Sequence, residues 1–242
     1  MKLQKIIPLL AVLFFITAVN AEISVKIIEM KGSVKIRFGL EETWKPAFVG
    51  LFLEDMDTIL AGENSLVVLQ FENGNTFTLG SFAMLDIGDL RRIIEKELFL
   101  YLMSKKVEQI ETQDEKTPLL IGNVSVVRGE SKIDSDSSLN ISLKSTWVEW
   151  EINGALSLYK QQYYPNTVVK LYKVLEKYES YEDCGKIFYY IARSLEQLEM
   201  DGQAIDAYQS VIDAYFKQKC DGEVSQARVE ESRKAINNLK EL

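Results

Sequence analysis

Between residues 32 and 79, short runs of alternating apolar and polar residues are separated by glycines, and this pattern constrains the fold more than any other. Two of the runs begin at Val34 and Val67. A period of two predicts short β-strands that bury one face. Glycines lie where each run must reverse, and Asn73-Gly74 indicates a hairpin turn in which both central residues adopt positive φ. The stretch therefore predicts short antiparallel strands joined by tight turns.

The same stretch has a fixed order of strand and turn residues. It contains a Gly-x-Val strand, a Trp-x-Pro turn, a glycine before a leucine, aspartate, isoleucine and glycine series, and a serine-led strand that ends in Asn-Gly. These residues are Gly32, Val34, Trp44, Pro46, Gly50, Leu53, Asp57, Ile59, Gly62, Ser65, Leu69 and Gly74. In them the chain resembles the FecR-like domain, a family named after the periplasmic part of the ferric citrate regulator. The resemblance implies a β-domain of the cell envelope, over residues 22–130, that senses or binds, and it implies no reaction.

Residues 1–21 have the composition of a secretory signal peptide. Lys2 and Lys5 precede an apolar stretch over residues 6–19, and small residues around Ala21 fit a cleavage site. Cleavage after Ala21 predicts a secreted or periplasmic protein with no later stretch long and apolar enough to span a membrane. The alternative is an uncleaved membrane anchor, although this apolar stretch is shorter than the roughly 20 residues that span a bilayer.

The net charge of the chain limits the classes of partner that it can bind. The chain carries 28 basic and 36 acidic side chains and a net charge of −8. Removal of residues 1–21 takes away two lysines and no acidic residue, so the net charge moves from −8 to −10. An acidic chain without a basic cluster is poorly suited to nucleic acid or to anionic membrane surfaces. We therefore expect protein or cell-wall polymer partners and no nucleic acid.

The residue types argue against catalysis. The chain has no histidine, the commonest general base and metal ligand at neutral pH, and two cysteines alone cannot form a zinc site. No glycine-rich phosphate loop occurs, and Asp57 is expected to hydrogen-bond its own turn. Composition alone does not exclude a glycosidase with two catalytic carboxylates, but nothing in the sequence positions such a pair. The sequence predicts no catalytic residue, no cofactor and no metal site.

After the strands the apolar spacing changes to three and four residues. This spacing predicts a helix over residues 90–105, inserted in the β-domain and capped by Asp89. The alternative is a pair of strands, because residues 98–102 form a dense apolar run. A charged loop over residues 111–116 and a closing strand over residues 118–128 complete the predicted β-domain.

Residues 131–145 are interpreted as a linker and a last strand. Residues 129–138 are rich in Ser, Asp and Gly, and Leu139, Ile141 and Leu143 alternate with polar residues. From residue 146 to residue 242 the spacing is helical. The tryptophans Trp147 and Trp150 are expected to fill a core between the two domains, and the alternative is that they stack on a ligand.

The helical region contains an internal repeat with a period of 37 residues. Each copy predicts a helix, a turn and a second helix, with the turns at residues 164–166 and at Asp201-Gly202. The predicted core of the repeats consists of Ala155, Leu158, Leu171, Phe188, Ala192, Leu195, Ala204 and Tyr208. In its second copy the chain resembles a tetratricopeptide repeat. The first copy departs from that pattern at Glu151 and Thr167, and a capping helix is predicted over residues 224–239.

The repeat also predicts where the two cysteines lie. Cys184 precedes the first helix of the second copy and Cys220 follows its second helix, so both lie at one end of an antiparallel pair. Export to an oxidising compartment favours a Cys184–Cys220 disulfide. The alternative is two unpaired thiols.

Together these patterns predict an α+β protein in which an all-β FecR-like domain, a sandwich or a roll, is followed by tetratricopeptide-like helical hairpins. We expect a non-enzymatic envelope protein that binds a protein or a cell-wall polymer through both parts. The alternative function is a sensor or accessory component of an envelope signalling relay of the iron-regulator type. The sequence predicts no oligomeric state.

Overall fold

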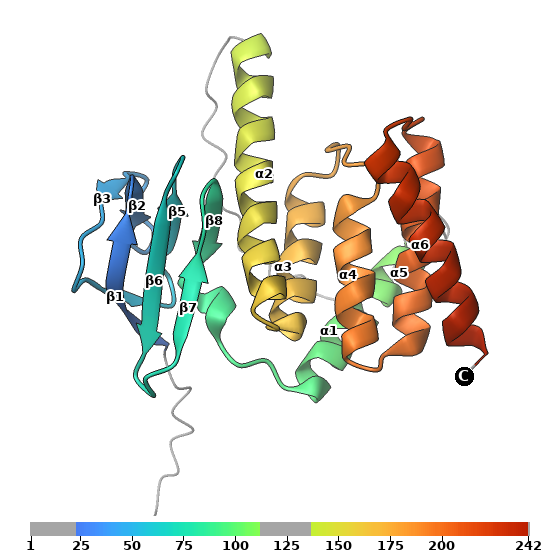
Figure 1. Cartoon of the computed structure of the whole chain (residues 1–242), viewed down its shortest axis with the longest axis horizontal. Coiled ribbons are helices and arrows are strands. Elements are labelled where there is room, and N and C mark those ends of the chain that lie inside the picture. Colours follow the sequence, from blue (N-terminus) through green and yellow to red (C-terminus); the bar gives the residue numbers. More distant parts are fainter. Residues whose placement is uncertain (1–22, 112–136, 242) are drawn as a thin grey trace, which may run out of the picture.

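The computed structural model describes residues 23–111 and 137–241, and these residues form a β-domain and a helical domain that lie side by side (Figure 1). This arrangement confirms the α+β class, with antiparallel sheets of short strands followed by helices. The predictions for the signal peptide, the loop at residues 112–116 and the strand at residues 118–128 lie outside the described residues.

The β-domain consists of two antiparallel sheets of four strands each. The first has the order β4-β1-β6-β7, and its strands are β4 (Phe52–Glu54), β1 (Ser24–Lys31), β6 (Leu66–Phe71) and β7 (Thr76–Leu79). The second has the order β3-β2-β5-β8, and its strands are β3 (Lys45–Pro46), β2 (Val34–Arg37), β5 (Thr58–Ala61) and β8 (Ala83–Asp86). Alternate residues of both sheets, such as Ile27, Ile36 and Leu69, are fully buried in one apolar core. The period of two therefore predicted the buried face correctly.

The hairpin between β6 and β7 is present, but its turn differs from the prediction. Gly74 has a φ of +85°, whereas Asn73 does not adopt positive φ. The N–H of Gly74 donates to the carbonyl of Phe71 at 3.0 Å, as in a type I turn followed by a left-handed glycine. The asparagine side chain instead accepts the N–H of Asn75 at 2.9 Å. Only one of the two residues needs the conformational freedom of glycine.

A helix follows the sheets, which excludes the strand alternative, but it begins later than predicted. A 3-10 helix, η1 (Ile87–Leu90), ends the β-domain, and α1 (Glu95–Glu111) follows after four residues. Asp89 lies inside η1 and does not cap α1, because its carboxylate binds two lysines of the helical domain. The apolar side of α1 packs in the core of the helical domain through Leu98 and Leu102. The helix predicted as an insertion in the β-domain thus belongs to the helical core.

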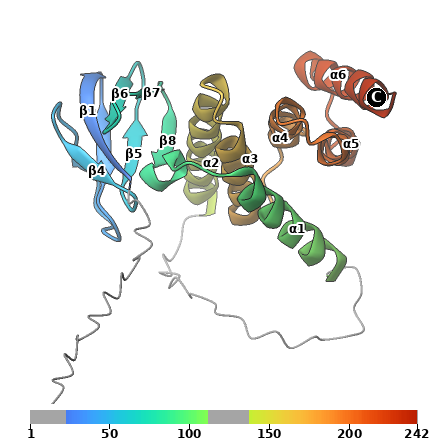
Figure 2. The ribbon, with the colours of Figure 1, turned by 90° about the horizontal axis from the view of Figure 1, so that it is seen from below.

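The helical domain continues with two hairpins and a last helix (Figure 2). Its helices are α2 (Ser137–Lys160), α3 (Tyr164–Lys177), α4 (Lys186–Gln197), α5 (Asp201–Lys217) and α6 (Glu223–Lys240). The strand predicted at residues 139–143 is wrong, because these residues form the first turns of α2. Three alternating apolar residues are too short a pattern to distinguish a strand from the start of a helix.

The predicted turns of the repeat lie three residues too late. Tyr164 begins α3, with Pro165 in its first turn, and Asp201 begins α5. Proline is suited to the first turn of a helix because its missing N–H has no intrahelical acceptor there. The turns themselves occupy residues 161–163 and 198–200.

The repeat core is largely as predicted, with two exceptions. Ala155, Leu171, Ala192, Leu195, Ala204 and Tyr208 are each at most 1% exposed in the helical core. Phe188 is only partly buried. Leu158 is fully buried, but its neighbours are the core residues of the β-domain. One residue of α2 therefore completes the core of the β-domain.

The predicted Cys184–Cys220 disulfide is present, with the two Cα atoms 6.0 Å apart. It joins the entrance of α4 to the residues after α5, and it closes the second hairpin at one end. The capping helix is also confirmed as α6, which packs on α5. In the described part of the chain, no helix combines the length and apolar character needed to cross a membrane.

The contact between the domains depends on Gly154 in the middle of α2. A Cβ atom at this position would lie 2.0 Å from the carbonyl oxygen of Met84 on β8. Glycine weakens a helix interior, but here it lets the helix backbone touch the strand backbone. This role of Gly154 was not predicted from the sequence, although a glycine within a helical pattern can indicate a close packing contact.

Candidate functional site

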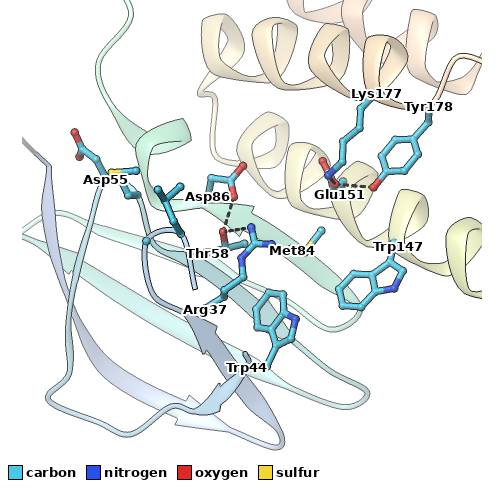
Figure 3. Close-up of a pocket in the computed structure, with 13 residues that line it drawn as sticks. Arg37, Trp44, Asp55, Thr58, Met84, Asp86, Trp147, Glu151, Lys177 and Tyr178 are labelled. Carbon is cyan, nitrogen blue, oxygen red and sulfur yellow. Dashed lines mark hydrogen bonds and ion pairs between the residues drawn. The ribbon is translucent and has the colours of Figure 1, made fainter. Parts of the chain in front are cut away.

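A cavity of about 460 Å³ lies where the second sheet meets α2 and the end of α3 (Figure 3). Its lining comes from β2, β5 and β8 on one side and from α2 and the α3 C-terminus on the other. At the mouth, Leu40 and Met56 are 75% and 61% exposed, so the cavity is open to solvent. We call it the junction cavity.

Two tryptophans from different domains meet at this cavity. Trp44, from the loop before β3, stacks on Trp147 of α2 with ring centroids 5.9 Å apart and planes inclined by 21°. Trp147 and Trp150 lie edge to face, with ring centroids 5.4 Å apart and planes inclined by 65°. Trp44 and Trp147 line the cavity and remain partly exposed. The sequence predicted that Trp147 and Trp150 fill a core between the domains. Trp147 does contact the β-domain through Trp44, but both predicted residues are only partly buried.

A hydrogen-bonded row crosses the sheet side of the cavity (Figure 3). The guanidinium of Arg37 donates to Thr58 Oγ1 at 3.0 Å, and Thr58 donates to Asp86 Oδ1 at 2.7 Å. Arg37 also lies over the ring of Trp44, 5.5 Å from its centroid. Its Nε is buried without a hydrogen-bond partner among the described residues. This row connects the aromatic pair to a carboxylate.

The helix side of the cavity holds a buried carboxylate. Glu151 of α2 is 4% exposed, and its Oε1 accepts hydrogen bonds from Lys177 and from the hydroxyl of Tyr178, the latter at 2.8 Å. Burial, together with the charge of Glu151, raises the pKa of Tyr178 above its usual value. The glutamate that interrupted the apolar pattern of the first repeat is therefore a core residue with its own donors.

Lys170 lies behind the cavity wall and forms ion pairs with carboxylates from both of its sides. It is 3% exposed, and its Nζ lies 2.9 Å from Asp89, 3.0 Å from Asp86 and 3.6 Å from Glu151. Burial alone lowers the pKa of this lysine, but the three carboxylates outweigh burial and raise it. The group stays positively charged at neutral pH, and it holds α2, α3 and the end of the second sheet together.

The pKa of Asp86 moves in the opposite direction. Burial alone raises it, but the charge of Lys170 and the hydrogen bonds from Thr58 and Lys170 lower it to about 2.

Asn166 adds a second link across the junction, since its amide donates to the carbonyls of Asp89 and Arg91 at 2.7 Å each. The wall of the cavity is fixed by charges and hydrogen bonds.

Of the residues that carry the FecR resemblance, Trp44 alone lines the junction cavity. The others shape the β-domain. Asp57 accepts the N–H of Glu54 in its own turn, as expected, and also that of Gly39, at 2.9 Å each. Pro46 is exposed on the edge strand β3.

The serine and glycines of the motif lie in tight turns. Ser65 is buried, and its Oγ accepts the N–H of Ser33 at 2.9 Å. Gly32 has a φ of +76°, and a Cβ there would lie 2.5 Å from Ser65 Oγ. Gly50 has a φ of +97°, and the N–H of Gly62 donates to the Ser33 carbonyl at 2.9 Å. These four residues are structural and contribute nothing to the cavity wall.

Most of the polar lining was not predicted from the sequence. Arg37, Asp86 and Lys177 lie in ordinary strand and helix patterns, where a charged residue is usually solvated. The available signals were Glu151, which breaks an apolar pattern, and Lys170, which lies between the apolar residues Val168 and Leu171. Among residues 23–111 and 137–241, no group of three or more acidic or cysteine side chains is arranged to hold a metal ion.

Comparison with known proteins gives no match for this chain: no family model matches it, and no similar curated protein or solved structure is found.

Proposed function

We propose that this protein is a non-enzymatic binding protein of the cell envelope, in which a FecR-like domain and tetratricopeptide-like hairpins together hold a protein or cell-wall partner. The observation that carries the proposal is the junction cavity, because each domain contributes one tryptophan and several polar groups to it. Concave sites with aromatic walls and a few fixed polar groups are typical of ligand binding.

The ionisation of the lining supports binding over catalysis. A general acid or base works best with a pKa near the operating pH. Asp86 has a pKa of about 2, and the pKa of Tyr178 is raised, so neither exchanges protons readily at neutral pH. Glu151 accepts two hydrogen bonds in a fixed position. These groups are suited to orient a ligand.

Export supports the envelope location. The N-terminal sequence has the features of a signal peptide, and the Cys184–Cys220 disulfide fits an oxidising compartment. The mature protein would begin at residue 22 and act in the periplasm or outside the cell.

The proposal is tested by capture from an envelope fraction. The immobilised mature chain, residues 22–242, is incubated with membrane-free envelope extract and, separately, with purified cell-wall polymer. We expect a partner that the wild type retains and that the Trp44→Ala, Trp147→Ala double variant loses.

Trp150→Phe is the matched control, because Trp150 adjoins the pair but does not line the cavity. Point variants are preferable to removal of the helices, since Leu158 completes the core of the β-domain. Retention of every partner by the double variant would contradict the proposed site.

A further inference from the structure

We propose that the junction cavity binds a neutral saccharide unit of a glycan chain. This inference rests on the proposed binding function and names the chemical class of its ligand. It is argued from the aromatic surfaces, the hydrogen-bonding groups and the charge balance of the cavity.

The cavity has an aromatic surface on which a sugar can stack. Sugars with equatorial hydroxyls have flat faces of C–H groups, and these faces stack on indole rings. Trp44 and Trp147 present such rings from two domains, and both side chains are only partly buried. The exposed side chains of Leu40 and Met56 extend this apolar surface at the mouth.

The wall of the cavity contains both hydrogen-bond donors and hydrogen-bond acceptors. A sugar hydroxyl donates one hydrogen bond and accepts others, so it can satisfy a cation and a carboxylate at once. The cavity presents Arg37 and Lys177 as donors and Asp86 and Glu151 as acceptors.

The charged groups at and behind the cavity wall balance one another. The carboxylates of Asp86, Asp89 and Glu151 are matched by the ammonium groups of Lys170, Lys173 and Lys177. A charged ligand would have to compete with one of these pairs, and the competition would leave the buried carboxylate of Asp89 or Glu151 with fewer partners. A purely apolar side chain of a peptide would cover the charged groups without bonding to them. A neutral ligand that carries hydroxyls avoids both costs.

The size and shape of the cavity agree with this ligand. Its volume of about 460 Å³ falls in the range of roughly 300–1,000 Å³ that small-ligand sites occupy. Because the mouth is open, the saccharide units on either side of the bound one can continue into solvent.

The intrinsic fluorescence of the protein provides the readout. The chain has three tryptophans, and Trp44, Trp147 and Trp150 all lie at this cavity or beside it. The mature chain is titrated with a tetramer of β-1,4-linked N-acetylglucosamine and with a tetramer of β-1,4-linked glucose. Tryptophan emission and calorimetric heat are recorded together.

We expect a saturable change in emission with at least one tetramer. Trp44→Ala and Trp147→Ala should each weaken its binding about tenfold, the loss typical of a central contact. Trp150→Phe should leave the affinity unchanged. Circular dichroism of each variant shows whether it is folded, and the two alanine variants remove the two halves of one stacked pair from different domains. Binding of the N-acetylglucosamine tetramer alone would indicate an amino-sugar polymer of the cell-wall type, and binding of both would show that the acetamido group is not required.

Binding of neither tetramer, or binding that both alanine variants leave unchanged, would overturn the saccharide assignment. If the envelope extract then still yields a protein partner that depends on Trp44 and Trp147, the proposed binding function stands with a peptide ligand. If no partner is captured either, both proposals fail.

Discussion

Lys170 is the residue on which the contact between the two domains depends most. Its ammonium group is buried among carboxylates that come from β8, from η1 and from α2. A buried charge is tolerated only when it is paired and hydrogen-bonded. Removal of the cation leaves two carboxylates, those of Asp89 and Glu151, largely buried with fewer partners.

Lys170→Met should therefore lower the free energy of unfolding by about 3–5 kcal/mol, the range for a broken buried ion pair. Lys173→Met is the matched control. Its side chain is 53% exposed beside the same Asp89, and its loss should cost less than about 1 kcal/mol. Urea unfolding of both variants measures the difference, and equal losses would show that burial of the cluster does not matter.

Acid should weaken the junction through Asp86. Its pKa is about 2 in the folded protein, against an ordinary value of 3.8, so the ionised carboxylate favours the folded state. This contribution is complete above about pH 4 and is lost as the pH falls toward 2. Asp86→Asn should accordingly flatten the fall in melting temperature over that window. Parallel melting curves for wild type and variant would argue against this role.

At the scale of elements, the packing of α2 on β8 depends on a backbone contact. Gly154 places the helix so close to Met84 that no side chain fits between them. The same helix carries Trp147 and Glu151 to the cavity wall, because the two residues are four positions apart and so lie on one face of α2. The position of α2 on the sheet thus sets the geometry of the cavity.

Gly154→Ala tests this contact. Helix propensity alone would favour alanine by about 1 kcal/mol. The Cβ atom would meet Met84 O at 2.0 Å, so we expect a net loss of about 1–3 kcal/mol in denaturant unfolding. Gly202→Ala is the control on α5, because a Cβ there meets nothing within 4 Å, and it should be neutral or stabilising. A stabilising Gly154→Ala would contradict the close approach.

At the scale of the whole molecule, the two domains are coupled in the same region that forms the cavity. Leu158 of α2 is buried in the core of the β-domain, and Tyr163 packs against Phe77 of β7. Gln161 bonds both backbone groups of Thr78, at 2.9 and 2.8 Å. The apolar and polar contacts both favour unfolding of the domains as one unit.

Thermal unfolding should therefore show one transition, although chains of two domains often show two. Tryptophan fluorescence reports the junction, while far-UV circular dichroism reports mostly the helices. We expect the two midpoints to coincide in the wild type and to separate in Lys170→Met. A fluorescence transition well below the helical one in the wild type would show that the domains separate before they unfold.

The elements that depend on neighbouring residues could be predicted from the sequence. The period of two predicted the sheets, the 37-residue repeat predicted the hairpins, and the placement of Cys184 and Cys220 predicted their bond. Such patterns can be read locally because strand and helix periods and turn residues act over a few positions.

Which distant residues meet depends on how the helices and strands pack, and the sequence does not show this. Lys170 and Asp86 are 84 positions apart, and Trp44 and Trp147 belong to different domains. A carboxylate such as Glu151 is stable inside a core only if its partners arrive with other elements. Those partners depend on how α2 docks on β8, and this docking depends on the shape of both surfaces at once. The cavity could not be foreseen for that physical reason.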